Sequence, residues 1–205
     1  KAVHDGANIL ILSDRATDAA HLPVPMLLAT SAVHHHLIRA GLRNHAGIVV
    51  EGGEPREVMH FALLFGYGVN AVCPTTALAT IRELAEAGLL ETPVTPAQAL
   101  DNYITAVKKG LLKTFSRMGI STLRSFFGSQ IFEAVGLGEQ LVDRYFTGTA
   151  SRIGGIGLRE VAAEAVARHR KGWCESGCPG GLLDAGGDYH LRFDGERHTL
   201  GPEAI

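Results

Sequence analysis

Three short runs of apolar residues, each followed by a stretch with helical spacing, most constrain what this chain can fold into. The runs lie at residues 8–12, 47–50 and 71–73, and their apolar residues are consecutive rather than alternating. Continuous apolar runs are typical of parallel strands that are covered on both faces. Because short strand–helix–strand units form right-handed crossovers, the pattern predicts an α/β fold of mostly parallel βα units.

The stretches between and after these runs carry the start and stop signals of helices. Ser31 and Gly41 are placed to cap the two ends of the first helix. Pro55 suits the first turn of the second helix, and Thr95 opens a capping box before a long one. The helices expected from these signals cover residues 31–40, 54–65, 77–87, 95–118, 130–135 and 158–171, and a further strand is expected at residues 120–126.

Composition and charge exclude several classes of protein. The 205 residues are 46% hydrophobic and 20% charged, which is typical of a folded globular domain. A net charge of −2 and the lack of a long basic run argue against a nucleic-acid partner. No apolar run reaches the roughly 18 residues of a membrane helix or forms a signal peptide, so we expect a cytoplasmic protein with no membrane partner.

Neither the adjacent histidines nor the cysteines have the spacing of a metal site. His34, His35 and His36 point about 100° apart on a helix, so they cannot converge on one ion. Three cysteines are too few for a disulfide framework or a four-thiolate zinc site. We therefore expect no bound metal, and we expect reduced thiols at Cys73, Cys174 and Cys178.

The sequence offers one weak candidate for acid–base chemistry. Glu51 ends a predicted strand and Glu54 begins the next helix, and active sites of α/β proteins lie at the carboxyl ends of strands. A turn followed by an acidic helix start explains the same residues and is the preferred interpretation. No Gly-x-Ser-x-Gly elbow or active-site cysteine signature is present, so no catalytic residue is expected.

The segment at residues 147–157 is the most suggestive of a binding function. It combines hydroxyl groups, one arginine and closely spaced glycines directly before a predicted helix. Free N–H groups at a helix start attract anions, whereas glycine also serves a connector with demanding backbone angles. We therefore regard it as a loop that binds an anion or contacts another domain, with these candidate residues: Thr147, Thr149, Ser151, Arg152, Gly154, Gly155 and Gly157.

The last 33 residues lose the regular pattern. Residues 175–181 are rich in glycine and include Pro179, which is typical of a linker, and residues 188–200 are compatible with a small hairpin. We therefore predict one domain at residues 1–172 and a short irregular tail at residues 173–205.

Several long segments of the chain resemble the central domain of the glutamate synthase large subunit. The resemblance covers nearly the whole chain in the family's order, and such long segments are more specific than any short motif. The segments that carry it are residues 31–39 (SAVHHHLIR), 53–58 (GEPREV), 61–68 (FALLFGYG), 109–113 (KGLLK), 116–123 (SRMGISTL), 130–137 (QIFEAVGL) and 145–153 (YFTGTASRI).

The resemblance implies a fragment of an enzyme that transfers the amide nitrogen of glutamine to 2-oxoglutarate, giving glutamate. It implies that residues 1–172 form a rudimentary TIM-barrel-like domain, and that residues 173–205 lead into the domain that binds flavin mononucleotide (FMN). The family's glutaminase domain begins with a nucleophilic cysteine, whereas this chain begins with Lys1. FMN and an iron–sulfur cluster would belong to other parts of the parent enzyme.

The resemblance therefore implies a non-catalytic connector that helps to form the wall of an ammonia tunnel between the glutaminase and FMN-binding domains. The isolated chain is expected to be inactive, with no catalytic or cofactor-binding residue of its own. The alternative is an independent α/β domain that binds an anion or a small molecule through residues 147–157.

Overall fold

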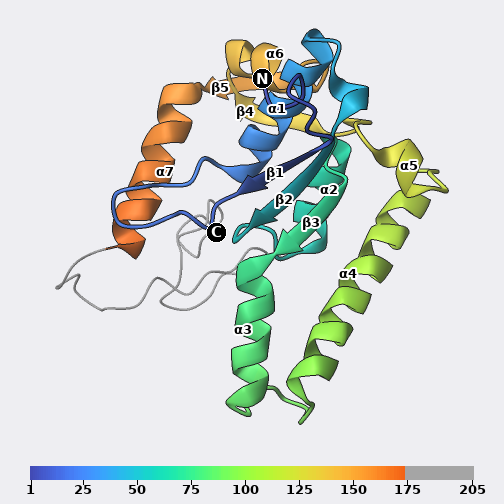
Figure 1. The fold of residues 1–205 in the computed structure, drawn as a ribbon, viewed down its shortest axis with the longest axis vertical. Coiled ribbons are helices and arrows are strands. Elements are labelled where there is room, and N and C mark those ends of the chain that lie inside the picture. The colour runs from blue at the N-terminus through green and yellow to red at the C-terminus, as the bar shows by residue number, and fades with distance from the viewer. Residues whose placement is uncertain (174–205) are drawn as a thin grey trace, which may run out of the picture.

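A computed structural model of the chain describes residues 1–173. Its first half alternates strands and helices, and a long helix connects it to a second, smaller strand-containing unit (Figure 1). The elements in chain order are β1 (Ile9–Ser13), α1 (Met26–Arg39), the 3₁₀ helix η1 (Arg43–His45), β2 (Gly47–Gly52), α2 (Val58–Gly66), β3 (Ala71–Pro74), α3 (Thr75–Glu86), α4 (Pro96–Arg117), α5 (Leu123–Phe126), β4 (Glu133–Leu137), α6 (Glu139–Tyr145), β5 (Ala150–Ile156) and α7 (Leu158–Gly172).

The three predicted apolar runs form one parallel sheet in the order β1-β2-β3. Leu10 pairs with Ile48 and Leu12 with Val50, so these side chains share the face that packs against the helices. Ile48 and Val50 are completely buried. The prediction of an α/β fold built from parallel βα units is therefore confirmed for this half of the chain.

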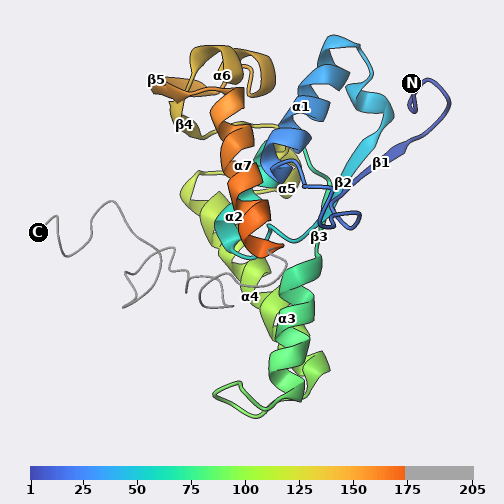
Figure 2. The ribbon, with the colours of Figure 1, turned by 90° about the vertical axis from the view of Figure 1, so that its left-hand side faces the viewer.

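The other face of this sheet differs from the expectation of strands covered on both sides. Helices α1, α2 and α7 all lie on one side of the three strands, as Figure 2 shows with the sheet seen nearly from its edge. The side chains of Ile9 and Ile11, which point to the other side, remain 59% and 64% exposed. A continuous apolar run identified the strands correctly, but the part of the chain that the structure describes leaves this second face of β1 exposed.

A second parallel pair, β4 and β5, lies apart from the first sheet, with α6 as its crossover helix. It corrects two predictions. The strand expected at residues 120–126 is instead the short helix α5, because this turn places Phe126 fully buried against Phe115 of α4, with ring centroids 4.3 Å apart. The helix expected at residues 130–135 gives way to β4, because β5 supplies a parallel partner for it.

The remaining helix predictions are mostly confirmed, with changes at the starts of the first two helices. Helix α2 begins at Val58 with Glu57 as its N-cap, so Pro55 precedes the helix and does not lie in its first turn. Helix α1 begins at Met26, five residues before the predicted cap Ser31, which is buried inside the helix and donates a hydrogen bond to the carbonyl of Tyr145. Thr95 accepts from the N–H of Gln98 at 3.3 Å and so caps α4 as expected. Helix α6 was not predicted.

Helix α2 contributes to all three groups of packed apolar side chains. Leu64 packs with the sheet and α1, Leu63 lies against α6, and Phe61 packs with α4 and α5. Because these contacts face different directions, α2 is the central element of the fold. Helices α3 and α4 lie side by side and project away from it (Figure 1).

The described strands belong to two separate sheets of three and two strands and do not close a barrel. None of the helices described at residues 1–173 is long and apolar enough to cross a membrane. The predicted linker, the hairpin at residues 188–200, Cys174 and Cys178 all lie outside the described residues.

Candidate functional site

The segment at residues 147–157, expected to be a loop, is largely a strand. Residues Ala150–Ile156 form β5 and pair in parallel with β4. The pairing is irregular, because Ser151 pairs with Ala134 while Ile153 pairs with the next residue, Val135. The skipped residue, Arg152, therefore occupies a bulge.

Glycine is required in this strand at one position above all. A side chain at Gly155 would overlap the carbonyl oxygen of Gly136 on the neighbouring strand. Gly154, by contrast, has open space around the position of a side chain. Gly155 thus allows the backbones of β4 and β5 to approach closely, and it is not needed for the approach of a ligand.

The predicted site residues do not converge on one point. Thr149 is only 8% exposed and faces the interior, whereas Arg152 is 84% exposed and lies 3.5 Å from the carboxylate of Glu133. Ser151 is exposed as well, and Thr147 donates from Oγ1 to the carbonyl of Asp143 at 2.7 Å. This distribution suits a surface strand anchored at one end better than a binding loop.

The helix start that made this segment a candidate for anion binding already carries a carboxylate. The N–H of Gly157 donates to Oε2 of Glu160 at 2.9 Å, within the first turn of α7. A negative charge at this position satisfies the helix start and repels a second anion. The geometry therefore favours domain contact over anion binding for residues 147–157.

Thr149 instead takes part in a buried polar junction that the sequence did not reveal. Its hydroxyl lies 2.8 Å from the hydroxyl of Tyr67 and 3.3 Å from Nε2 of Gln130. The same nitrogen donates to the carbonyl of Thr147 at 2.8 Å and lies 3.3 Å from Nε2 of His35. This junction joins α1, the end of α2, and the segments that directly precede β4 and β5.

Gln130 is the centre of this junction. Its backbone has a φ of +51°, the only positive φ of a non-glycine residue among residues 1–173, and its N–H donates to the carbonyl of Gly66 at 3.1 Å. Burial raises the pKa of Tyr67 and lowers that of His35, so both groups stay neutral at pH 7. Neutral groups that hydrogen-bond one another suit a structural role.

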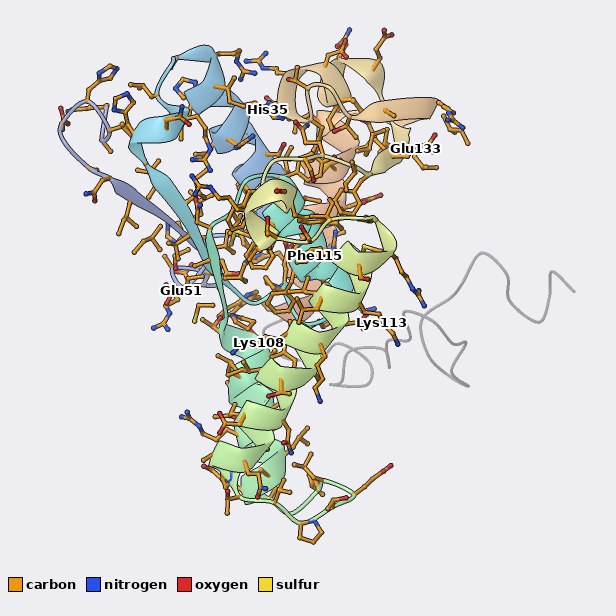
Figure 3. All side chains as sticks on the ribbon, turned by 90° about the vertical axis from the view of Figure 1, so that its right-hand side faces the viewer. His35, Glu51, Lys108, Lys113, Phe115 and Glu133 are labelled. Atoms are coloured by element: carbon orange, nitrogen blue, oxygen red, sulfur yellow. The ribbon has the colours of Figure 1, made fainter. Side chains whose placement is uncertain are left out.

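The three adjacent histidines diverge, as helical geometry predicts. His35 lies inside, between α1 and the β4–β5 unit (Figure 3), His36 is exposed, and His34 is buried on a third side, with Nδ1 accepting from Nε of Arg43 at 2.9 Å. Within residues 1–173, no group of three His, Cys, Asp or Glu side chains could hold a metal ion.

The two carboxylates at the carboxyl end of β2, Glu51 and Glu54, also bind structural partners. Glu51 accepts from Ser13 at 2.8 Å and forms an ion pair with Arg15 at 2.7 Å, on the side of the sheet away from the helices (Figure 3). Glu54 accepts from the backbone N–H of Met26 at 2.7 Å. The two carboxylates thus have separate tasks, and the geometry favours the structural interpretation over an acid–base pair.

Glu54 acts as the N-terminal cap that α1 lacks in its own sequence. Replacing Glu54 with alanine should therefore lower the free energy of unfolding by about 1 kcal/mol. Urea denaturation at pH 7 measures the change. Glu83→Ala on the exposed side of α3 is the matched control and should change stability by less than about 0.5 kcal/mol. Equal effects of the two substitutions would contradict the capping role.

A sequence model described as "Glutamate synthase central domain" matches residues 1–138, which is most of the described structure. The chain belongs to the glutamate synthase family. The resemblance noted from the sequence segments is therefore confirmed, and the match includes both the three-stranded sheet and β4.

Curated relatives in the glutamate synthase family align with the whole chain. It is 44% identical over 205 residues to the glutamate synthase [NADPH] large chain of Bacillus subtilis, and 40% identical over 213 residues to glutamate synthase [NADH] of Saccharomyces cerevisiae. It is 42% identical over 214 residues to the ferredoxin-dependent glutamate synthase 2 of Synechocystis, and 98% of the chain is covered. The alignments span only 13%, 10% and 14% of these relatives, respectively.

Proposed function

We propose that the chain is the non-catalytic central connector of a glutamate synthase large subunit. In this role it joins a glutaminase domain to an FMN-binding domain and forms part of the wall of the tunnel that carries ammonia between them. Residues 1–172 would be the connector itself, and residues 173–205 would lead into the FMN-binding domain.

The surface of the β4–β5 pair carries this proposal. Val135 and Ile153 pair with each other across the two strands and are 64% and 60% exposed. Arg152 and Glu133 add charged groups at the same surface. A two-stranded sheet with exposed apolar side chains is marginal in water, and an apolar patch with a polar rim is typical of a surface that contacts another domain.

The carboxylates that the sequence offers near the end of β2 and at the start of α7 have structural partners, which supports a connector. Glu51, Glu54 and Glu160 each bind a group of the protein itself. FMN and an iron–sulfur cluster are the groups that the family implies, and the described residues fit neither. The N–H of Gly157 at the glycine-rich helix start already has an acceptor, and no cluster of metal ligands is present there.

The similarity to relatives that use different electron donors also supports this role. Relatives named for NADPH, NADH and ferredoxin share 44%, 40% and 42% of their aligned residues with the chain. A segment that recognised the electron donor would have to differ among these enzymes. Comparable similarity to all three instead suits a part of the enzyme whose task is independent of the donor.

The connector role predicts that damage to the β5 surface uncouples the two half-reactions. In the complete glutamate synthase polypeptide that contains this segment, Ile153→Asp should lower glutamine-dependent glutamate synthesis several-fold. Synthesis from added ammonium and the hydrolysis of glutamine should both persist, because the two active sites remain intact. The experiment measures the three activities and the free ammonia released during turnover with glutamine. Arg152→Ala, at an exposed position, should act in the same direction with less risk to folding.

Leu112→Asp is the matched control for this experiment. Leu112 is 65% exposed on α4, so the substitution introduces the same charge at a similar exposure away from β5. It should leave the ratio of glutamine-dependent to ammonium-dependent synthesis unchanged. If Ile153→Asp and Arg152→Ala abolish both kinds of synthesis equally while the FMN content stays intact, β5 belongs to the chemistry and the connector role is wrong.

A further inference from the structure

Strand β1 lies at one edge of the three-stranded sheet but has the sequence of an interior strand (Figure 1). Its first four residues are apolar without interruption, which is typical of the buried interior strands of parallel sheets. Strand β3, at the opposite edge, is only four residues long and ends with Pro74, and both features are common in edge strands. The edge formed by β1 lacks such features.

The backbone of β1 leaves a row of hydrogen-bonding groups unpaired along this edge. The carbonyl of Asn8 accepts from the N–H of Gly47 at 2.9 Å, and the N–H of Asp14 donates to the carbonyl of Glu51 at 3.2 Å. Because backbone groups point alternately to the two sides of a strand, the even-numbered residues of β1 bond to β2 and the odd-numbered residues face outward. The N–H and carbonyl groups of these odd-numbered residues have no backbone partner among residues 1–173.

The side chains and the space beside this edge are largely apolar. Ile9 and Ile11, whose backbone groups face outward, also have exposed side chains. A hollow of about 440 Å³ adjoins the carboxyl half of β1, and the exposed side chains of Leu22 and Val24 line it together with Ile11. A partner for this edge therefore needs both an extended row of backbone hydrogen-bonding groups and apolar side chains.

We propose that a further strand of the parent glutamate synthase polypeptide, from outside residues 1–205, pairs with the free edge of β1. An extended strand presents N–H and carbonyl groups at the spacing that this edge requires, whereas a helix uses its own groups internally. Apolar side chains on the added strand would contact Ile9 and Ile11. The proposal rests on the place of the chain within a larger polypeptide, but not on the connector role.

The parent polypeptide is a better source of this strand than a second copy of the chain. The aligned segment makes up only 13% of the Bacillus subtilis relative and 14% of the Synechocystis relative, so most of such a polypeptide lies outside it. A second copy would have to bind through one five-residue edge, whereas stable complexes bury about 1,200 Å² or more. A strand of the same polypeptide needs no such area, because it is already held nearby.

Hydrogen exchange in the complete parent polypeptide tests this pairing, with single residues resolved by mass spectrometry after electron-transfer fragmentation. The amide protons of Ile9 and Ile11 should exchange about as slowly as those of Leu10 and Leu12, which bond to β2. In the 205-residue chain the same residues should alternate, with Ile9 and Ile11 exchanging on the order of 100-fold faster than Leu10 and Leu12. Alternation in the wild-type parent as well would overturn the proposal.

Ile11→Lys provides a second test in the parent. A lysine at this position opposes burial under an added strand, so the amide proton of Ile9 should exchange several-fold faster than in the wild-type parent. In the 205-residue chain the same substitution should leave the exchange of Ile9 unchanged. Leu112→Lys, at a similar exposure on α4, is the matched control and should leave the exchange of Ile9 unchanged in both proteins.

The 205-residue chain also distinguishes the other possible partners of β1. Slow exchange of Ile9 and Ile11 at every protein concentration would place the partner within the chain itself, and slow exchange only at high concentration would indicate a second copy. Either result overturns the proposal. The wild-type parent decides it even if Ile11→Lys fails to fold. None of these measurements depends on ammonia transfer, so their outcome is separate from that of the connector role.

Discussion

Gly68→Ala should lower the free energy of unfolding by about 3 kcal/mol or more. Gly68 has a φ of +93°, which side chains rarely adopt. An alanine Cβ would also overlap Nδ1 of His34 and lie 2.6 Å from its Cε1. The backbone cost of about 1–2 kcal/mol therefore adds to an overpacking cost of about 1–3 kcal/mol.

Gly88→Ala separates these two contributions. Gly88 has a φ of +67°, but nothing lies within 4 Å of the position of its Cβ, so this variant bears only the backbone cost. Urea denaturation of both variants at pH 7 gives the comparison. If Gly68→Ala is no more destabilising than Gly88→Ala, His34 does not pack against Gly68 as described.

Acidification from pH 7 to pH 4 should destabilise the chain by about 2 kcal/mol through His34 alone. Burial, followed by the charges of Arg43 and His35, lowers the pKa of His34 from 6.5 to about 4. Because the folded state binds the proton less readily than the unfolded state, this stabilisation is complete above about pH 6.5. It is lost as the pH falls towards 4. The full shift of the His34 pKa corresponds to about 3 kcal/mol. Solvent in the polar hollow that His34 lines reduces this contribution.

His34→Gln isolates this contribution, because glutamine can still accept from Arg43 but does not titrate. Its free energy of unfolding should fall less steeply between pH 7 and pH 4 than that of the wild type. His36→Gln, at an exposed position of the same helix, should keep the wild-type dependence on pH. A wild-type pH dependence in His34→Gln would show that His34 titrates normally.

The first half of the fold was predictable because its signals are local. The runs that became β1, β2 and β3 are apolar without interruption, and the helices between them have clear apolar faces. The start of α1 was missed because its cap, Glu54, follows the next strand and lies 28 residues from Met26 in the sequence. Such a cap leaves no pattern near the helix that it stabilises.

The second half depended on contacts that the sequence does not display. Residues Glu133–Leu137 have a weak strand pattern and contain Gly136, so β4 exists because β5 pairs with it. The glycines of β5 indicated a loop, yet Gly155 serves the close approach of the two strands. The polar junction at Gln130 was missed for the same reason, since its partners are far apart in the sequence. The adjacent histidines are the one signal of this junction in the sequence, and a run of histidines suggests metal ligands before it suggests structural hydrogen bonds.

Strand β1 lies at the edge of its sheet, and an exposed edge strand can pair with other chains and cause aggregation. Residues Ile9–Ser13 include neither a lysine nor a proline, which are the residues that usually prevent an edge strand from joining other chains. Two exposed isoleucines on this strand make such pairing more favourable still. A neighbouring part of the parent protein that covered β1 would remove this exposed edge and its two isoleucines from water.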